Sequence, residues 1–377
     1  MLKRALQNVL IGMTFVGLAA PGVLHAQEAG GMLQARFPEL ANYLNASEVL
    51  QATVFEEIAL TNESPDSAIG KTLLRESLVE LSKASYSHYH TSANHLAMLG
   101  PHRLAESRAT PGIQAMVREE YSAAEIERAL LANGSIPPRA MGVLKRGREF
   151  AEQLLDIYLN DAIYDKHGAI DEALANYLSN NELSVAALPK SSDLLSKHQY
   201  AYAFRVGFPQ LSGMTWASQW LQLATLEITM MASSQASLEA GIANVADLYV
   251  QKIARAHGSM MSLPTDIPTM PVIAPNVYSF HPGAAYVIDN IAALKVVIGD
   301  ILAHPDVPDR GAAIENMVAQ FTAKEEYLDQ EMNYLTFVLR GGIFNQGGPA
   351  LGGMEQSERN RSRVATESQH ISNYPMR

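Results

Sequence analysis

The feature that most restricts the fold of this chain is a run from residue 215 to residue 257 that contains no proline and a single glycine, Gly241. Basic side chains occupy its last turns and Gly258 follows directly, a pattern typical of a helix C-terminus. With 43 residues, the run is longer than an ordinary globular helix. The pattern therefore predicts one long helical run, which is either a single rod or two helices that meet near residues 233–234.

Helical periodicity extends over most of the chain, and no segment has the alternating pattern of a β-strand. Ser47 is a candidate cap for a first helix that ends near Leu60, and Ser122 and Glu125 have the spacing of a capping box. The sequence predicts an all-α fold, a multi-helix bundle. Further helices are expected at about 67–99, 139–164, 171–178, 284–303 and 312–339.

The N-terminal segment has the features of a secretory signal peptide. Lys3 and Arg4 are followed by an apolar stretch and by small or aliphatic residues that end at Ala26. We expect cleavage after Ala26, which makes the mature protein periplasmic or secreted; the alternative is an uncleaved anchor. A later apolar run, which begins at Tyr286, is interrupted by charged residues, so we expect no transmembrane span in the mature chain.

Charge and cysteine content restrict the partners and the chemistry. The 377-residue chain has a formal net charge of −11 and no cysteine. A negative chain has no general electrostatic attraction to nucleic acid, so we expect no nucleic-acid partner of that kind. The absence of cysteine excludes disulfides and thiolate metal ligands.

Composition divides the chain into segments. Five prolines exclude regular helix from residues 259–283, and the apolar residues between them predict an ordered, extended strap. Six glycines between residues 341 and 353 precede a polar end that we expect to be disordered. The predicted organisation is a signal peptide (1–26), an N-terminal helical domain (27–258), the proline-rich strap (259–283), a C-terminal helical hairpin packed on the preceding domain (284–340) and a Gly-rich tail (341–377).

The histidines are the strongest candidates for a site. His88, His90, His95 and His102 lie within residues 85–103. On a continuous helix His88 and His95 share one stripe with Leu74, but seven residues rise about 10 Å, so these two cannot chelate one ion alone. A metal site completed by other helices, interior hydrogen-bonded histidines and a pH-sensitive contact all stay open. We expect a neighbouring helix to face this stripe.

Other signatures of chemistry are missing from the sequence. It has no G-x-S-x-G nucleophile elbow, no H-E-x-x-H zinc motif and no phosphate-binding lysine in its glycine-rich segment. Trp216 and Trp220 are one turn apart, either as a packing pair or as an aromatic anchor of an interface. We therefore assign no catalytic, cofactor-binding or metal-ligating residue and expect no cofactor, which favours a protein that is not an enzyme.

The C-terminal half resembles one family. The segments QASLEAGIANVADLYVQKIAR (235–255) and ENMVAQFTAKEEYLDQEMNYL (315–335), separated by a proline-containing break, look like IcmX/TraW-type periplasmic components of Dot/Icm-like (type IVB) secretion and conjugation systems. The resemblance rests on helix order and scattered residues over about 100 to 140 residues. It implies a non-enzymatic, oligomeric part of an envelope-spanning channel, and it supplies no catalytic residues.

Two functions are therefore expected. The first is an exported, non-enzymatic helical structural or interaction component of an envelope-spanning transfer apparatus, with protein partners in the cell envelope and association into homo-oligomers. The alternative is a periplasmic helical-bundle protein that binds a ligand or metal, or acts as an enzyme, through histidines around residues 88–102.

Overall fold

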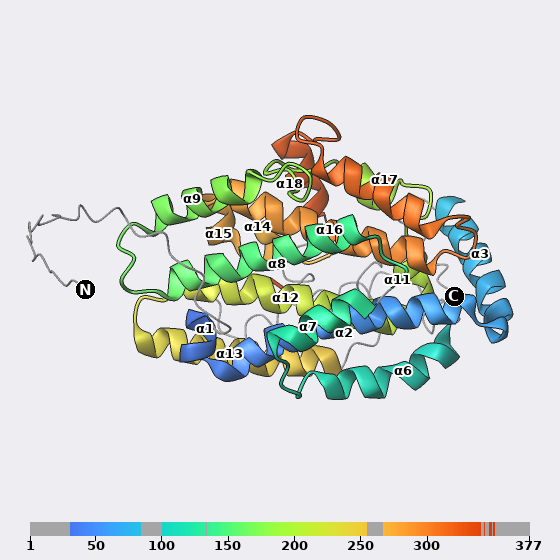
Figure 1. The fold of residues 1–377 in the computed structure, drawn as a ribbon, viewed down its shortest axis with the longest axis horizontal. Coiled ribbons are helices and arrows are strands. Elements are labelled where there is room, and N and C mark those ends of the chain that lie inside the picture. Colours follow the sequence, from blue (N-terminus) through green and yellow to red (C-terminus); the bar gives the residue numbers. More distant parts are fainter. Residues whose placement is uncertain are drawn as a thin grey trace, which may run out of the picture.

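The computed structural model describes residues 31–83, 100–132, 134–254, 267–340, 343, 347, 348 and 350. The predicted all-α fold is confirmed, because these residues form sixteen α-helices and one 3₁₀ helix and no strand (Figure 1). The predicted signal peptide (1–26) and His88, His90 and His95 lie outside the described residues. The elements are α1 (Met32–Arg36), α2 (Pro38–Glu63), η1 (Pro65–Ser67), α3 (Ala68–Lys83), α6 (Arg103–Met116), α7 (Ala123–Ala132), α8 (Pro138–Leu159), α9 (Lys166–Leu178), α10 (Asp193–Ser196), α11 (Ala203–Gly207), α12 (Pro209–Met231), α13 (Gln235–Ala254), α14 (Met270–Ile273), α15 (Pro275–Phe280), α16 (Pro282–Ala303), α17 (Arg310–Thr322) and α18 (Glu331–Leu339).

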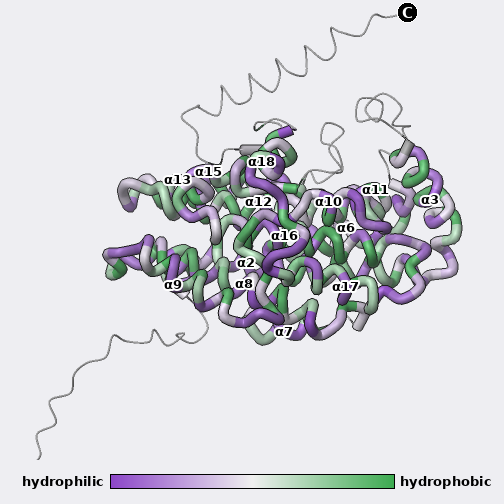
Figure 2. The backbone as a smooth tube through the Cα atoms, turned by 90° about the horizontal axis from the view of Figure 1, so that it is seen from above, coloured by the Kyte–Doolittle hydropathy of each residue, from purple (hydrophilic) through white to green (hydrophobic). Residues whose placement is uncertain are grey.

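Helix α16 is the centre around which the other helices pack. Of its 22 residues, 17 are buried, as expected for a helix that is apolar on every side. It contacts α2, α8, α11, α15 and α17, and Figure 2 shows it in the middle of the molecule. One hydrophobic core contains residues from Leu33 to Ala350, so helices from both predicted parts, 27–258 and 284–340, share it. No described helix is long and apolar enough to cross a membrane.

The long helical run is divided into two helices. Helix α12 ends at Met231 and α13 begins at Gln235, which confirms the second alternative. Ser234 and Ser237 exchange side-chain to backbone hydrogen bonds of 3.0 and 3.1 Å at the new helix start. The two helices return along each other, because Ser218 Oγ and Tyr249 OH lie 3.4 Å apart.

The proline-rich segment differs from the predicted extended strap. Its described part, residues 267–281, lies ordered on the bundle as expected, but it contains the short helices α14 and α15. Pro271, Pro275 and Pro282 stand in the first turn of α14, α15 and α16. A proline at that position loses no hydrogen bond and has the φ angle that a helix requires. The prolines therefore start helices here, whereas the sequence argument treated them only as helix breakers.

Two other predicted helix boundaries were wrong. Ser47 lies inside α2 and donates to Leu44 O at 2.7 Å, because Pro38 begins that helix earlier. The expected helix over 312–339 is interrupted between α17 and α18, where Ser191 N donates to Tyr327 O at 2.7 Å and Asp329 N donates to Pro189 O at 2.9 Å. This pairing with residues 189–191 replaces the intrahelical bonds.

The capping box is confirmed. Ser122 N donates to Glu125 Oε2 at 2.9 Å, and Glu125 N donates to Ser122 Oγ at 3.3 Å, so the two residues start α7 together.

In the glycine-rich segment, Trp220 Nε1 donates to Gly347 O at 3.0 Å and Ala350 N donates to Ile273 O at 2.8 Å. The described residues of that segment thus lie on α12 and α14.

Buried carboxylates hold the N-termini of four helices. Each accepts one or more backbone N–H groups at 2.9–3.3 Å from the first residues of a helix in another part of the chain. These N–H groups have no partner within their own helix, and a negative charge at that end is favoured by the helix dipole. The four carboxylates, with the helices they cap, are Glu106 (α12), Glu227 (α15), Asp289 (α14) and Asp300 (α11).

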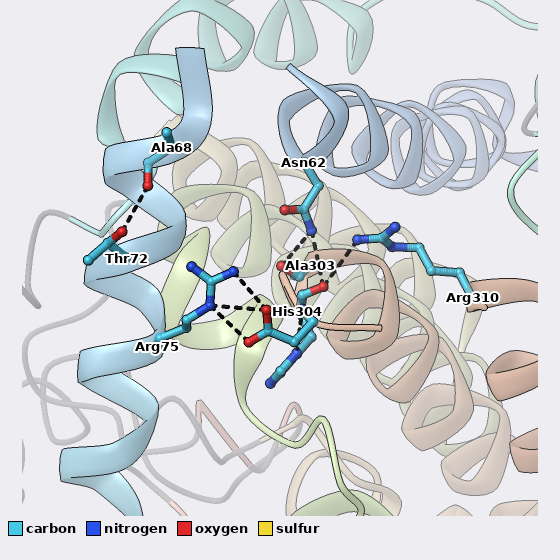
Figure 3. A network of polar contacts seen from close by, with 8 residues as sticks. Asn62, Ala68, Thr72, Arg75, Ala303, His304 and Arg310 are labelled. Atoms are coloured by element: carbon cyan, nitrogen blue, oxygen red, sulfur yellow. Dashed lines mark hydrogen bonds and ion pairs between the residues drawn. The ribbon is translucent and has the colours of Figure 1, made fainter. Parts of the chain in front are cut away.

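At the C-terminus of a helix the unpaired groups are carbonyl oxygens, and side-chain N–H groups donate to them. At the end of α16, Asn62 Nδ2 donates to Leu302 O and Ala303 O at 2.8 and 2.7 Å, and Arg310 Nη2 donates to His304 O at 3.1 Å (Figure 3). These donors satisfy carbonyl groups that the helix itself leaves unpaired.

Candidate functional site

The described helices enclose a cavity between α2, α8, α12 and α16. Its volume is about 70 Å³, and α11 and residues 267–268 complete the wall. The lining residues are Leu44, Ser47, Glu48, Gln51, Arg148, Glu152, Leu155, Phe204, Arg205, Ser212, Thr215, Trp216, Ser218, Gln219, Gln222, Ile267, Pro268, Ala292, Lys295 and Val296. Charged and amide side chains next to apolar ones make this cavity the strongest candidate for a binding site.

Two ion pairs lie on the cavity wall. Lys295 Nζ on α16 is 3.1 Å from Glu48 Oε1 on α2, and both side chains are largely buried. Arg148 Nη1 donates to Glu152 Oε1, one turn further along α8, at 2.9 Å. Burial raises the pKa of Glu152, Arg148 lowers it and the charge of Glu48 raises it, so the two pairs lie within electrostatic reach of each other. Half of the Glu152 side chain is exposed, so Glu152 stands where the cavity meets solvent.

A third ion pair lies behind the cavity wall. Arg205, which lines the cavity, donates from Nη2 to Asp300 Oδ2 at 2.8 Å and to Leu195 O at 3.0 Å. His198 Nε2 is 3.4 Å from the same carboxylate. Burial alone would raise the pKa of Asp300, but Arg205 and His198 hold it below its usual value. Asp300 is therefore an ionised cap of α11, and its position is fixed.

Unpaired donors occur on two of the lining residues. Gln219 Nε2 and Arg148 Nε are shielded from solvent and have no hydrogen-bond partner among the residues that the structure describes. A buried donor without a partner costs about 1–3 kcal/mol.

Among the four clustered histidines, His102 is within the described part of the chain. It precedes α6, and its ring stacks on Phe208 with centroids 4.6 Å apart. Its Nε2 has no hydrogen-bond partner within the described ranges. Burial, with a smaller effect from Lys71, lowers the pKa of His102 to about 4. This neutral, stacked ring fits the interior alternative. Across the described residues, no three histidine or acidic side chains are grouped so that they could hold a metal ion.

The two tryptophans have a packing role. Trp220 is buried on α12, and Lys252 Nζ from α13 lies 4.5 Å from its ring centroid and 5.2 Å from that of Trp216. Gly347 lies against the same two rings, and its positive φ of 83° suits glycine. Trp216 also lines the cavity, so this packing sets one of its walls.

Sequence reasoning missed the cavity residues, although one signal was present. Asp289, Lys295 and Asp300 interrupt the apolar run of α16, where the sequence analysis used them only to exclude a membrane span. A charge inside a helix that is apolar on every side must be buried, and a buried charge requires a partner. That rule points to all three residues, but it does not identify their partners.

No protein-family model matches the chain, and neither the curated proteins nor the solved structures include a significant match to it.

Proposed function

We propose that the protein is an exported, non-enzymatic helical component that binds other proteins of the cell envelope within a type IV secretion or conjugation apparatus. One observation carries the proposal. All four fully buried carboxylates of the described chain are used as helix caps: Glu106, Glu227, Asp289 and Asp300. These four buried groups stabilise the fold, which favours a structural role for them over a catalytic one.

The argument from these carboxylates is chemical. A general acid or base must reach the proton it transfers within hydrogen-bond distance. The oxygens that accept backbone N–H groups are already occupied by the helices that they cap, and Tyr334 OH also donates to Asp289. Burial raises the pKa of Glu106 to about 8 and that of Asp289 to about 7, against the backbone hydrogen bonds, which lower both. Such shifts also arise in structural networks, so they are no sign of catalysis here.

The surface of α18 offers a place for protein contact. Met332 and Leu339 lie seven residues apart on one face and are exposed by 71% and 37%. Tyr334 and Val338 are buried on the opposite face and pack in one cluster with Tyr286 of α16. An apolar stripe on a firmly held helix suits contact with a second copy of the chain.

The test is the assembly state of the natively exported, mature chain. Light scattering after size-exclusion chromatography should give a mass above that of the monomer, or envelope proteins should co-purify. Met332→Glu should reduce self-association, whereas Ile69→Glu, an equally exposed apolar residue on α3, is the matched control and should not. A strictly monomeric chain that retains no envelope protein would refute the proposal.

The cavity between α2, α8, α12 and α16 favours a second function, the binding of a small ligand. The two functions are compatible, because the residues that line the cavity and the exposed residues of α18 are different.

A further inference from the structure

The size of the cavity limits what it can hold. Its volume of about 70 Å³ corresponds to roughly five to seven water-sized positions when one water needs about 10–15 Å³ of such space. A ligand of about five to seven non-hydrogen atoms therefore fits, and larger molecules require the helices to separate.

The charges around the cavity are balanced. Lys295 is paired with Glu48, Arg148 with Glu152, and Arg205 with Asp300. A ligand with a net charge would add an uncompensated charge to this partly buried space, which is costly. A ligand that carries one charge of each sign adds none, and it can meet a cation and an anion of the wall at once.

The positions of the two lining pairs suit such a ligand. Lys295 and Glu48 join α16 to α2, whereas Arg148 and Glu152 both stand on α8. Because both pairs line the cavity, a ligand carboxylate can meet one of the two cations while its ammonium group meets Glu48 or Glu152. Charge-assisted hydrogen bonds of this kind are about twice as strong as neutral ones.

Uncharged groups complete the lining. Ser212, Thr215 and Gln222 add hydroxyl and amide groups from α12, and Gln219 supplies the unpaired amide donor. These groups can bind the remaining oxygen atoms of a ligand carboxylate. Ala292 and Leu155 leave a small apolar wall for a short side chain.

We propose that this cavity binds a small zwitterion with the size and charge arrangement of an α-amino acid. The proposal is independent of the envelope function, because it concerns the interior of the bundle and not its assembly.

The experiment is a calorimetric titration of the full mature chain with glycine, L-alanine and L-serine. Three probes of similar size serve as controls: propionate lacks the ammonium group, propylamine lacks the carboxylate, and glycerol lacks both charges. At least one amino acid should bind at least tenfold more tightly than every control. Equal binding of glycerol would overturn the proposal in favour of a neutral polar site, and a lack of heat with all probes would leave a cavity that holds only water.

Two variants locate the binding in the cavity. Ala292→Leu fills the space from α16 and should abolish binding, whereas Ala243→Leu makes the same change at an exposed position of α13 and should not. Arg148→Gln removes one cation and should weaken amino-acid binding at least tenfold while leaving any glycerol binding unchanged. Thermal unfolding of each variant checks that it is folded. Binding that survives Ala292→Leu in a folded protein would refute this location.

Discussion

Glu106 gives the most quantitative test of the account, because its burial couples folding to pH. The side chain is fully buried and caps α12, where Oε1 accepts N–H groups from Gln210 and Leu211. Burial raises its pKa from 4.5 to about 8, although both backbone hydrogen bonds lower it. Between these values the folded chain holds the proton and the unfolded chain has released it. The folded state therefore binds more protons, and its stability falls as the pH rises through this window.

The magnitude follows from the size of the shift. A shift of one pKa unit corresponds to about 1.4 kcal/mol, so a rise from 4.5 to about 8 represents about 5 kcal/mol of stability that is lost between pH 4.5 and pH 8. Glu106→Gln keeps a carbonyl oxygen that can cap α12 but cannot ionise. Its free energy of unfolding, relative to that of the wild type, should therefore increase by about 5 kcal/mol across this range.

Urea denaturation of both proteins at half-unit pH intervals measures the difference between their free energies of unfolding. The titrations of all other groups cancel in this difference, because both proteins contain them. The two curves can be offset by a constant, because the amide leaves a buried N–H₂ group where Oε2 has no partner. A difference that stays constant between pH 4.5 and pH 8.5 would refute the claim that burial controls the protonation of Glu106.

Three further predictions concern the fold. Asp300→Asn leaves Arg205 buried without its counter-charge and should destabilise the chain by about 3–5 kcal/mol, measured by urea denaturation. Asp193→Asn, which breaks the exposed pair of Asp193 and Lys197, should leave the stability almost unchanged. Gly348→Ala would place a Cβ atom too close to Val272 O, so it should release the glycine segment from Trp220. Tryptophan fluorescence would detect this release as a red shift, and an unchanged emission spectrum would contradict it. The Cβ atom that Gly112→Ala adds has no described atom within 4 Å, so the change should stabilise α6 by up to about 1 kcal/mol. Thermal unfolding measures this, and a loss of stability would show that Gly112 is needed there.

Local patterns predicted the helices and several of their ends. The capping box at Ser122 and the break between α12 and α13 depend on neighbouring residues, so the sequence contains the whole signal. The short helices α14 and α15 were missed because a proline that ends one helix can also begin the next. That ambiguity is resolved only by the packing of the segment on the bundle.

The cavity could not be predicted in the same way, because its contacts join distant parts of the chain. Lys295 and Glu48 are 247 residues apart, and nothing near Lys295 in sequence identifies the partner. The interruption between α17 and α18 has the same cause, since residues 189–191 supply the hydrogen bonds that end the helical pattern. The histidine cluster attracted attention by its density, yet its described member, His102, packs against Phe208.

Native mass spectrometry of the chain, purified from the cells that express it, tests the central claim most directly. The account holds that the protein acts by binding, with its buried charges committed to the fold. It predicts a mass that corresponds to two or more copies of the chain, or to a complex with envelope proteins. A single species at the mass of one bare chain, under conditions that preserve other envelope assemblies, would contradict it.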